Sequence, residues 1–330
     1  MNIGLLHRLR SAEGDFVPLE ALGADVGLVR KELAELEGFG FALEHHPYRG
    51  VAYRGPAWRL CPDQIEHELG TVHIGRRITV WNRVGSTNDL AARAASSTAN
   101  EGLVIMAEEQ TAGRGSRGRV WTAPPSTSLL ISFLLFPPAR LAETGWLTAL
   151  GAVATAEVVA KWTGQAAQIK WPNDVRVSGR KIAGILVERN LGAVVGIGLN
   201  VNLAASDLPL DLQTTATSIR ILANGTVDRS EVARDLIRRM DHWYGLGLES
   251  GPETLNRPWR DRSEHLGRLV RANTTDGTFE GRLEDLDLLV GATLDSPSGP
   301  IRLPGERILS LAVKDDALAG QAPDAVAPPA

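Results

Sequence analysis

The sequence has little of what marks a disulfide-bonded, nucleic-acid-coating or membrane-bound protein. Among 330 residues there is one cysteine, Cys61, which excludes an intramolecular disulfide and any multi-cysteine zinc site. We interpret it as a small buried apolar residue. The formal net charge of −4 argues against a chain that coats nucleic acid or is held to a membrane surface by charge.

Long apolar runs are also missing. No window approaches the roughly 20 consecutive apolar residues of a membrane span. The first residues, MNIGLLHRLRSAEGD, turn polar too early for a signal peptide. These absences predict a cytoplasmic protein with no membrane partner.

The material for a core is plentiful, because 43% of the residues are hydrophobic. Residues 1–62 contain three short helical patterns, marked by Leu5 to Leu9, Leu19 with Leu22, and Val26 to Leu36, followed by two strand-like runs around a turn at 41–54. Three small helices before a β-ribbon are the order of a winged helix-turn-helix domain. We therefore predict such a domain at 1–62.

Residues 70–262 alternate strand and helix patterns, which predicts an α/β domain built on one mixed sheet. A long helix is expected from Trp146 to Trp162, and another begins at Asp228. The expected strands are Ile78–Val84, Leu103–Glu108, Leu129–Phe136, Gln168–Trp171, Lys181–Glu188 and Val194–Asn202.

The C-terminal part changes character. Residues 267–313 hold short β runs at 269–272, 278–283, 288–294 and 301–303, separated by Gly and Pro, which favours a small SH3-like barrel. The Ala-, Pro- and Asp-rich tail at 314–330 is predicted to be disordered.

The most informative stretch is Gln110-Thr-Ala-Gly-Arg-Gly-Ser-Arg-Gly-Arg-Val-Trp121, which has three glycines and three arginines in seven positions. Glycine lets backbone N–H groups approach a ligand closely, and arginine offers planar forks to phosphate oxygens. The stretch is neither a Walker P-loop nor a dinucleotide fingerprint. A solvated basic linker and an RNA-binding segment are the alternatives, but short apolar strand patterns on both sides favour a loop that closes over a phosphate-bearing anion.

A second stretch runs from Lys170-Trp-Pro-Asn-Asp174 to Gly179-Arg-Lys-Ile-Ala-Gly-Ile-Leu-Val-Glu188. Turns at Pro-Asn-Asp and Ser-Gly place both lysines at strand ends, where side chains can line a cleft. Asp174, at a turn beside an asparagine, is a candidate Mg²⁺ ligand near phosphates. The alternative is an ordinary hairpin with solvent-facing lysines.

A third stretch, Gly85-Ser-Thr-Asn-Asp-Leu90, has the spacing of a capping box between Ser86 and Asp89, so a helix is expected to begin here. The free N–H groups and positive end of such a helix suit a carboxylate or another polar ligand head. Most capping boxes bind nothing, however, so this motif is weak alone.

In combination these motifs resemble the biotin protein ligase family. Ser-Thr-Asn, the glycine–arginine loop, Lys-Trp-Pro-Asn-Asp, Gly-Arg-Lys-Ile-Ala-Gly-Ile-Leu and Gly-Ile-Gly-x-Asn-Val-Asn occur in the family's order between Gly85 and Leu203. The loop together with Lys-Trp-Pro-Asn-Asp is the specific part. With its N-terminal segment, the chain is similar to the bifunctional form, a ligase that is also the biotin-operon repressor.

The resemblance implies a role for each matching residue. Ser86, Thr87, Asn88 and Gln110 would contact biotin; Arg114, Gly115 and Ser116 would fold over biotin and its adenylate; Trp121 would close the adenine side. Lys181 would hold the biotin carboxylate against the α-phosphate, with Arg114 and Arg117 as further catalytic cations. Lys170, Asn173 and Asp174 would line the ATP site.

The implied chemistry is adenylation of biotin by ATP with Mg²⁺, followed by transfer to a lysine of a biotin carboxyl carrier protein. Charge stabilisation of an in-line transition state calls for the arginines and lysine that the motifs supply. A lipoate–protein ligase shares the fold, and a biotin-sensing transcription factor without ligase activity is an alternative from another class. The family often dimerises through its catalytic sheet, which leaves a homodimer open.

The chain departs from the family pattern in two places. The loop usually has arginine at its fourth position, where this chain has Ser116. In the N-terminal segment, Arg30 and Lys31 are the candidate DNA contacts, yet residues 1–60 hold seven Lys/Arg against eight Asp/Glu. DNA binding normally needs a basic face, so a vestigial or allosteric domain competes with a working repressor that binds operator DNA.

Overall fold

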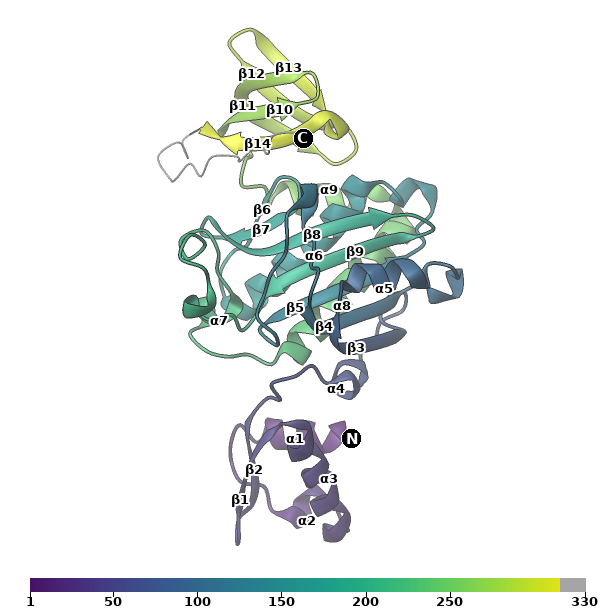
Figure 1. The fold of residues 1–330 in the computed structure, drawn as a ribbon, viewed down its shortest axis with the longest axis vertical. Helices are drawn as coiled ribbons and strands as arrows, with labels where there is room; N and C mark the ends of the chain where they lie inside the picture. Colours follow the sequence, from purple (N-terminus) through teal and green to yellow (C-terminus); the bar gives the residue numbers. More distant parts are fainter. Residues whose placement is uncertain (315–330) are drawn as a thin grey trace, which may run out of the picture.

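The structure, a computed structural model, describes residues 1–314 and has three parts arranged along its long axis, with the N-terminal part at the bottom of Figure 1 and the C-terminal part at the top. The tail predicted at 314–330 therefore lies outside the described residues apart from Lys314. Within residues 1–314, no helix is both long and apolar enough to cross a membrane.

The N-terminal part contains three helices and a hairpin. These are α1 (Ile3–Ser11), α2 (Leu19–Leu22), α3 (Val26–Phe39), β1 (Ala42–His46) and β2 (Gly50–Gly55). Asp25 caps α3 by accepting hydrogen bonds from the backbone N–H groups of Gly27 and Leu28, and Gly40 ends it in the left-handed region. Leu5, Leu9, Leu33 and Leu36 meet in a separate small core, so the predicted helical faces are buried as expected, except that Leu19 and Val26 are only half-buried.

A short segment with the helix α4 (Pro62–Glu66) leads into the central part. Leu60 packs in the central core, whereas its neighbour Cys61 packs in the N-terminal core. Cys61 is fully buried, as predicted, and burial raises the pKa of its thiol to about 11.

The central part is a seven-stranded mixed sheet in the order β3-β4-β5-β9-β8-β7-β6, in which only the pair β3–β4 is parallel. Its strands are β3 (Arg77–Val84), β4 (Leu103–Gln110), β5 (Ser128–Leu135), β6 (Gln168–Lys170), β7 (Asp174–Val177), β8 (Arg180–Arg189) and β9 (Ala193–Asn200). Six match the predicted ranges within two residues. β7 lies between the two predicted turns, where four residues are too few to give a strand pattern.

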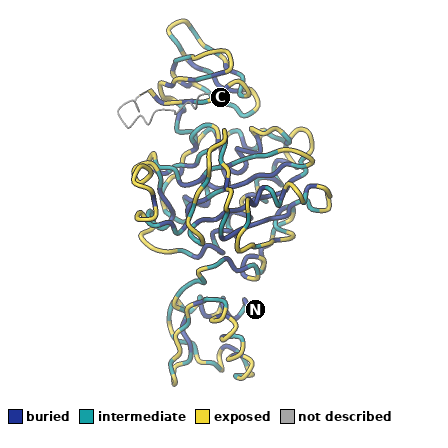
Figure 2. Tube along the Cα trace, viewed as in Figure 1, coloured by how far each residue is buried: buried dark blue, intermediate teal, exposed yellow. Residues whose placement is uncertain are grey.

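Helices cover both faces of this sheet (Figure 1). The predicted long helices, α6 (Thr144–Thr163) and α8 (Arg229–Ser250), pack on one face, and α5 (Thr87–Ala94) packs on the other. α6 lies between the sheet and α8 and is buried on nearly all sides, which explains its almost uniformly apolar sequence. Figure 2 shows the burial concentrated in this central part.

Shorter elements complete the central part. They are the helices α7 (Ile219–Ala223) and α9 (Asn256–Arg260) and 3₁₀ turns at Thr98–Asn100, Ser116–Gly118, Ala139–Leu141, Ala205–Asp207 and Pro252–Leu255.

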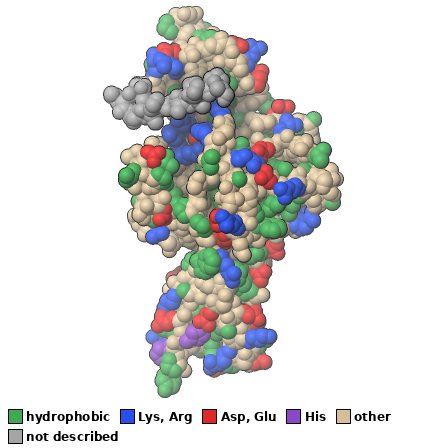
Figure 3. Space-filling model, viewed as in Figure 1, with side chains coloured by type: hydrophobic (Ala, Val, Ile, Leu, Met, Phe, Trp, Pro, Cys, Tyr) green, Lys and Arg blue, Asp and Glu red, His purple; other side chains and the backbone are tan. Residues whose placement is uncertain are grey.

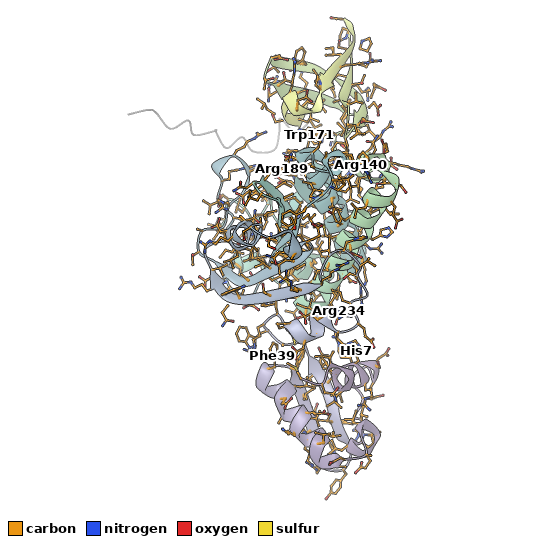
Figure 4. All side chains as sticks on the ribbon, turned by 90° about the vertical axis from the view of Figure 1, so that its right-hand side faces the viewer. His7, Phe39, Arg140, Trp171, Arg189 and Arg234 are labelled. Carbon is orange, nitrogen blue, oxygen red and sulfur yellow. The ribbon has the colours of Figure 1, made fainter. Side chains whose placement is uncertain are left out.

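The C-terminal part is a five-stranded antiparallel β domain, in the order β13-β12-β11-β10-β14. Its elements are β10 (Leu269–Thr274), β11 (Gly277–Asp287), β12 (Gly291–Ser296), β13 (Gly299–Pro304), a 3₁₀ turn at Gly305–Arg307 and β14 (Ile308–Val313). The first four strands were predicted and β14 was not. Trp171 lies at the junction with this domain (Figure 4), 5.6 Å from Trp259 between ring centroids, and its indole N–H donates to the carbonyl of Ile308.

Candidate active site

The main candidate site is a cavity on the α5 face of the sheet. The start of α5, the end of β4, the loop 111–127 and the strands β8 and β9 converge around it. The predicted site residues in its wall are Ser86, Thr87, Asn88, Gln110, Arg114, Gly115, Ser116, Trp121, Asn173 and Lys181. The structure therefore brings together motifs that lie up to 95 residues apart in the sequence.

Glycines form the floor of this cavity. A Cβ added to Gly196 would lie 2.3 Å from the Asn88 amide oxygen, and one added to Gly198 would lie 2.4 Å from the Trp121 ring. Gly184 on β8 is close to Trp121 as well. These glycines let two candidate ligand contacts reach the sheet. The motif Gly-Ile-Gly contained this signal, but the residues were not predicted as part of the site.

The first turn of α5 begins as predicted, but not through a capping box. Ser86 makes no capping hydrogen bond with its side chain. Instead the Gln110 side-chain oxygen accepts from the Thr87 N–H (2.7 Å) and hydroxyl (2.9 Å). Asp89, the other half of the expected box, is drawn away to Arg114. The Ser86 side chain therefore accepts no hydrogen bond from a helix N–H group and lies in the cavity wall.

A partly buried polar network fixes the next residue, Asn88. Its amide nitrogen donates to the Glu188 carboxylate at 2.7 Å, and its oxygen lies 2.6 Å from the hydroxyl of Ser132, which is also 2.7 Å from the Thr87 hydroxyl. Ser132 and Glu188 were not predicted. A serine within an apolar strand and a glutamate at a strand end give no distinctive sequence signal.

The glycine–arginine loop, residues 111–127, contains a small hairpin over the cavity. Trp121 N–H donates to the Gly113 carbonyl (3.0 Å), and Gly115 N–H donates to the Arg119 carbonyl (2.7 Å). Gly113 is needed here because a Cβ would lie 2.4 Å from the Trp121 carbonyl oxygen. The Ser116 hydroxyl accepts from the Arg119 guanidinium at 2.9 Å.

Arg114 is held by two carboxylates, 2.7 Å from Asp89 and 3.1 Å from Glu188. These hydrogen bonds raise the pKa of Arg114, and the contact with Arg114 lowers the pKa of Asp89. Because all three side chains are about 40% exposed, the contacts are open to exchange with a ligand anion.

Arg117, predicted as a third catalytic cation, lies outside the cavity wall. Its backbone is left-handed, with φ at 60°, and its guanidinium donates to the carbonyl of Leu309 on β14. The loop tip therefore contacts the C-terminal domain. This position of Arg117 does not support direct contact with a ligand in the cavity.

Lys181 is the least exposed cation in the cavity wall. Its backbone is pinned by hydrogen bonds with Thr215 and Thr217, and its ammonium lies 2.7 Å from Asp174 and 5.6 Å from the centre of the Trp121 ring. The Trp121 indole nitrogen is buried and has no hydrogen-bond partner within residues 1–314. A buried donor beside a cation is suited to an anionic or strongly polar ligand.

Two residues predicted for the ATP site do not line this cavity. Lys170 lies at the end of β6. Burial, together with the positive charge of Lys170, lowers the pKa of His265 to about 4. Asp174 lies outside the cavity wall and contacts the ammonium of Lys181, which is part of that wall. Across the described part of the chain no cluster of three His, Cys, Asp or Glu side chains could hold a metal by itself. Mg²⁺ usually takes one or two carboxylates plus substrate phosphates, which Asp174 fits.

A larger groove of about 630 Å³ adjoins the cavity and runs between the central and C-terminal parts. Ser116, Asn173, Ile185 and Leu186 line both spaces, so the two lie side by side. The cavity itself leaves about 110 Å³, less than the several hundred Å³ of an ordinary ligand pocket. The Trp121 ring over Gly198 lies in this cavity wall.

The predicted DNA contacts, Arg30 and Lys31, are exposed on α3 in the N-terminal part. Figure 3 shows acidic, basic and histidine side chains intermingled over this part. In contrast, Lys and Arg side chains gather on the central part just below the C-terminal domain.

Together, the mixed sheet, glycine floor and arginine loop define a site for a ligand that bears a carboxylate or phosphate. Residues 80–202 match the model of the biotin/lipoate A/B protein ligase family. The chain is 31% identical to the bifunctional ligase/repressor BirA of Bacillus subtilis, with 81% of this chain and 84% of the relative covered. It is 35% identical to the biotin–[acetyl-CoA-carboxylase] ligase of Mycobacterium tuberculosis, over 69% of this chain and 89% of that one.

Comparison with solved structures also finds biotin protein ligases. The biotin protein ligase of Aquifex aeolicus in complex with biotin and ATP superposes with a TM-score of 0.65 at 25% identity, covering 72% of this chain and 100% of that chain. The chain belongs to the biotin/lipoate protein ligase family and, within it, to the biotin protein ligases.

Proposed function

We propose that the protein is an ATP-dependent biotin protein ligase that attaches biotin to a lysine of a biotin carboxyl carrier protein. One observation carries this proposal: Lys181 and Arg114 lie with Trp121 in the wall of a single cavity floored by glycine. Family membership supplies the substrate class, because relatives are named biotin–[acetyl-CoA-carboxylase] ligases and a structural neighbour holds biotin and ATP.

In the first reaction, the biotin carboxylate attacks the α-phosphorus of ATP, the bond to the bridging β-oxygen breaks and pyrophosphate leaves. Negative charge develops on the phosphoryl oxygens and on the leaving group. In this proposal Lys181, which lies beside Asp174, holds the carboxylate against the phosphate, and Arg114 exchanges Asp89 and Glu188 for the adenylate. Electrostatic stabilisation of this kind needs no side-chain nucleophile.

In the second reaction, the acceptor lysine amine attacks the acyl carbon of biotinyl-5′-AMP, an amide forms and AMP leaves. Biotin contacts fall to Ser86, Thr87, Asn88 and Gln110 at the start of α5. Trp121 offers its ring to the adenine, and its indole N–H, which has no partner among residues 1–314, to a polar ligand atom.

Mg²⁺ would neutralise phosphate charge when bound. In this proposal Asp174 would hold it, next to Asn173, which lies in the cavity wall. Because Lys181 contacts Asp174, lysine and metal would share this carboxylate. Lys170 stands off the cavity and would act on ATP only at longer range.

The test is incubation with ATP, Mg²⁺, labelled biotin and a biotin carboxyl carrier domain, with labelled lipoate and its own acceptor in parallel. We expect label on the acceptor lysine with biotin alone. Transfer of lipoate instead would assign the chain to the other branch of the family. Adenylate-dependent DNA binding without transfer of either label would identify a sensor.

The same proposal assigns the flanking parts. The three helices and hairpin at 1–62 form a winged helix-turn-helix, residues 70–262 the catalytic domain and residues 267–313 an SH3-like barrel. Operator binding through Arg30 and Lys31, and a homodimer through the catalytic sheet, belong to the bifunctional form and are tested by gel shift and by sedimentation with and without biotinyl-5′-AMP.

A further inference from the structure

The joint between the N-terminal and central parts is built from buried backbone contacts. Leu60 N–H donates to the Glu108 carboxylate (2.5 Å), and Cys61 N–H donates to the Ser230 hydroxyl (3.0 Å). Since the two neighbouring side chains pack in different cores, neither core can shift without straining this segment. The connecting segment, Trp58–Cys61, is therefore a tight joint.

A buried ion pair holds this joint to the sheet. Arg229, at the first turn of α8, is 3% exposed, and Glu108 on β4 is 7% exposed; their charged groups are 2.5 Å apart. The guanidinium also donates to the carbonyls of Trp58 (2.7 Å) and Ser128 (3.1 Å). Removing one partner of such a pair leaves an uncompensated buried charge.

The same two residues hold the end of the glycine–arginine loop. The Glu108 carbonyl accepts from the N–H of Ser126, just before the loop 111–127 ends, and Arg229 binds Ser128, where β5 begins. Two residues beyond Glu108 on the same strand, Gln110 holds Thr87 in the cavity wall. Connecting segment, loop and cavity thus meet at one ion pair.

We propose that the Arg229–Glu108 ion pair couples the N-terminal part to the glycine–arginine loop, so that ligand binding in the cavity tightens the connecting segment and a shift of that segment loosens the loop. Both are positioning residues, since neither lines the cavity. The inference rests on the proposed function, in which the loop closes over biotin and ATP. Coupling between two sites acts equally in both directions.

The chain offers a matched control. Arg234, also on α8, is 4% exposed and donates to the backbone carbonyls of Gln64, Ile65 and His67, which follow the connecting segment in the chain. Figure 4 places it where the central part meets the N-terminal part. Among the described hydrogen bonds of Arg234, none goes to β4, β5 or the loop. Arg234→Lys therefore perturbs the contact of α8 with the residues that follow the joint, without touching the loop.

The first experiment uses the full chain without ligand. Trypsin cleaves after arginine, and the loop contains Arg114, Arg117 and Arg119. Arg229→Lys and Glu108→Gln should raise the rate of loop cleavage about tenfold, equivalent to about 1.4 kcal/mol of loop ordering, while Arg234→Lys keeps the parent's rate. Equal cleavage in the parent and both ion-pair variants, or an equal rise in Arg234→Lys, would overturn the proposal. Unchanged circular dichroism shows that each variant is folded.

The second experiment measures hydrogen exchange with and without biotin and ATP. In the parent and Arg234→Lys, binding should slow exchange at the loop and at the amides of Leu60 and Cys61. In Arg229→Lys and Glu108→Gln, only the loop should gain protection. Loop protection without a change at Leu60 and Cys61 in the parent overturns the coupling alone. An unprotected loop in the parent overturns the proposed function, and the trypsin experiment then decides the coupling.

Discussion

Two regions of this molecule carry exposed cations that the sequence marked for contact with an anion, and they are built differently. The loop 111–127 holds three arginines and no acidic residue. Its counter-charges, Asp89 and Glu188, come from other elements. On α3, Arg30 and Lys31 share their own helix with Glu32, Glu35 and Glu37.

The two regions differ in whether their cations can separate from the carboxylates that neutralise them. A ligand that enters the cavity can take Arg114 from its carboxylates, because these belong to α5 and β8. The glutamates of α3 are on the same helix as its cations, so they stay close to them when a ligand binds. Net potential, rather than the presence of arginine, decides whether a polyanion binds. We therefore expect strong anion recognition at the loop and weak recognition at α3.

The largest effect is expected from Lys181→Ala. Losing one preorganised cation beside the reacting phosphate typically lowers the rate by ~10²–10³, so pyrophosphate release should fall by that factor with the fold intact. Lys170→Ala, which removes a lysine outside the cavity wall, should lower the rate far less. Pyrophosphate release by Lys181→Ala close to the parent's rate, or equal losses in both variants, would contradict the assignment.

Ser116→Arg should restore a cation to the loop. A charge-assisted hydrogen bond contributes ~1.5–3 kcal/mol, so release of biotinyl-5′-AMP should slow by about 10- to 100-fold. The parent, with serine, should label lysines of a bystander such as albumin more than the variant does. Arg119 already donates to the Ser116 hydroxyl and could brace the loop by itself. Equal labelling and equal release rates in the parent and Ser116→Arg would contradict the prediction and show that Arg119 braces the loop by itself.

Gly198→Ala should have a smaller effect, of about tenfold on the KM for ATP. The added Cβ would lie 2.4 Å from the Trp121 ring, which must then move out of the cavity. Gly184→Ala is the milder comparison, because the Cβ added there would lie 3.2 Å from that ring. Steady-state kinetics with varied ATP measure both variants. A KM no higher in Gly198→Ala than in Gly184→Ala would contradict the placement of Trp121 at the adenine.

The smallest effect is expected at the N-terminal part. With seven basic and eight acidic residues in 1–60, the ligand-free protein should bind its own promoter DNA no better than typical non-specific affinities of ~10⁻⁴–10⁻⁶ M at physiological salt. Biotinyl-5′-AMP should strengthen binding if it drives dimerisation. Gel-shift titrations test both points, and nanomolar binding without ligand would refute the comparison between the two regions.

The sequence predicted the elements well wherever periodicity was long. α6, α8 and six strands of the central sheet follow apolar patterns that a core requires, and they were found within a few residues. β7 and β14 were missed because their strand character comes from their neighbours in the sheet. β7 has four residues between turns, and β14 is an edge strand that pairs with β10. Such pairings are set by tertiary contacts.

The candidate site shows the same division. Motif residues such as Gln110 and Lys181 were predicted, and the structure brings them together. Glu188 and Ser132 were not, because their part in the site depends on which strands become neighbours. Arg117 and Lys170 were placed in the site by sequence position alone, yet neither lines the cavity, and the Arg117 guanidinium donates to a carbonyl of β14 instead.

The side chains of Leu60 and Cys61 enter two different cores although they are consecutive in the chain. There is consequently no spacer between the N-terminal and central parts, and no peptide bond at which the chain can be divided cleanly. A cut before Leu60 strips the N-terminal core of Cys61, and a cut after Cys61 removes a leucine from the central one. Over evolutionary time, an insertion or deletion here would be purged unless both cores repacked together, so the spacing of these two residues should vary less among close relatives than the surrounding surface does.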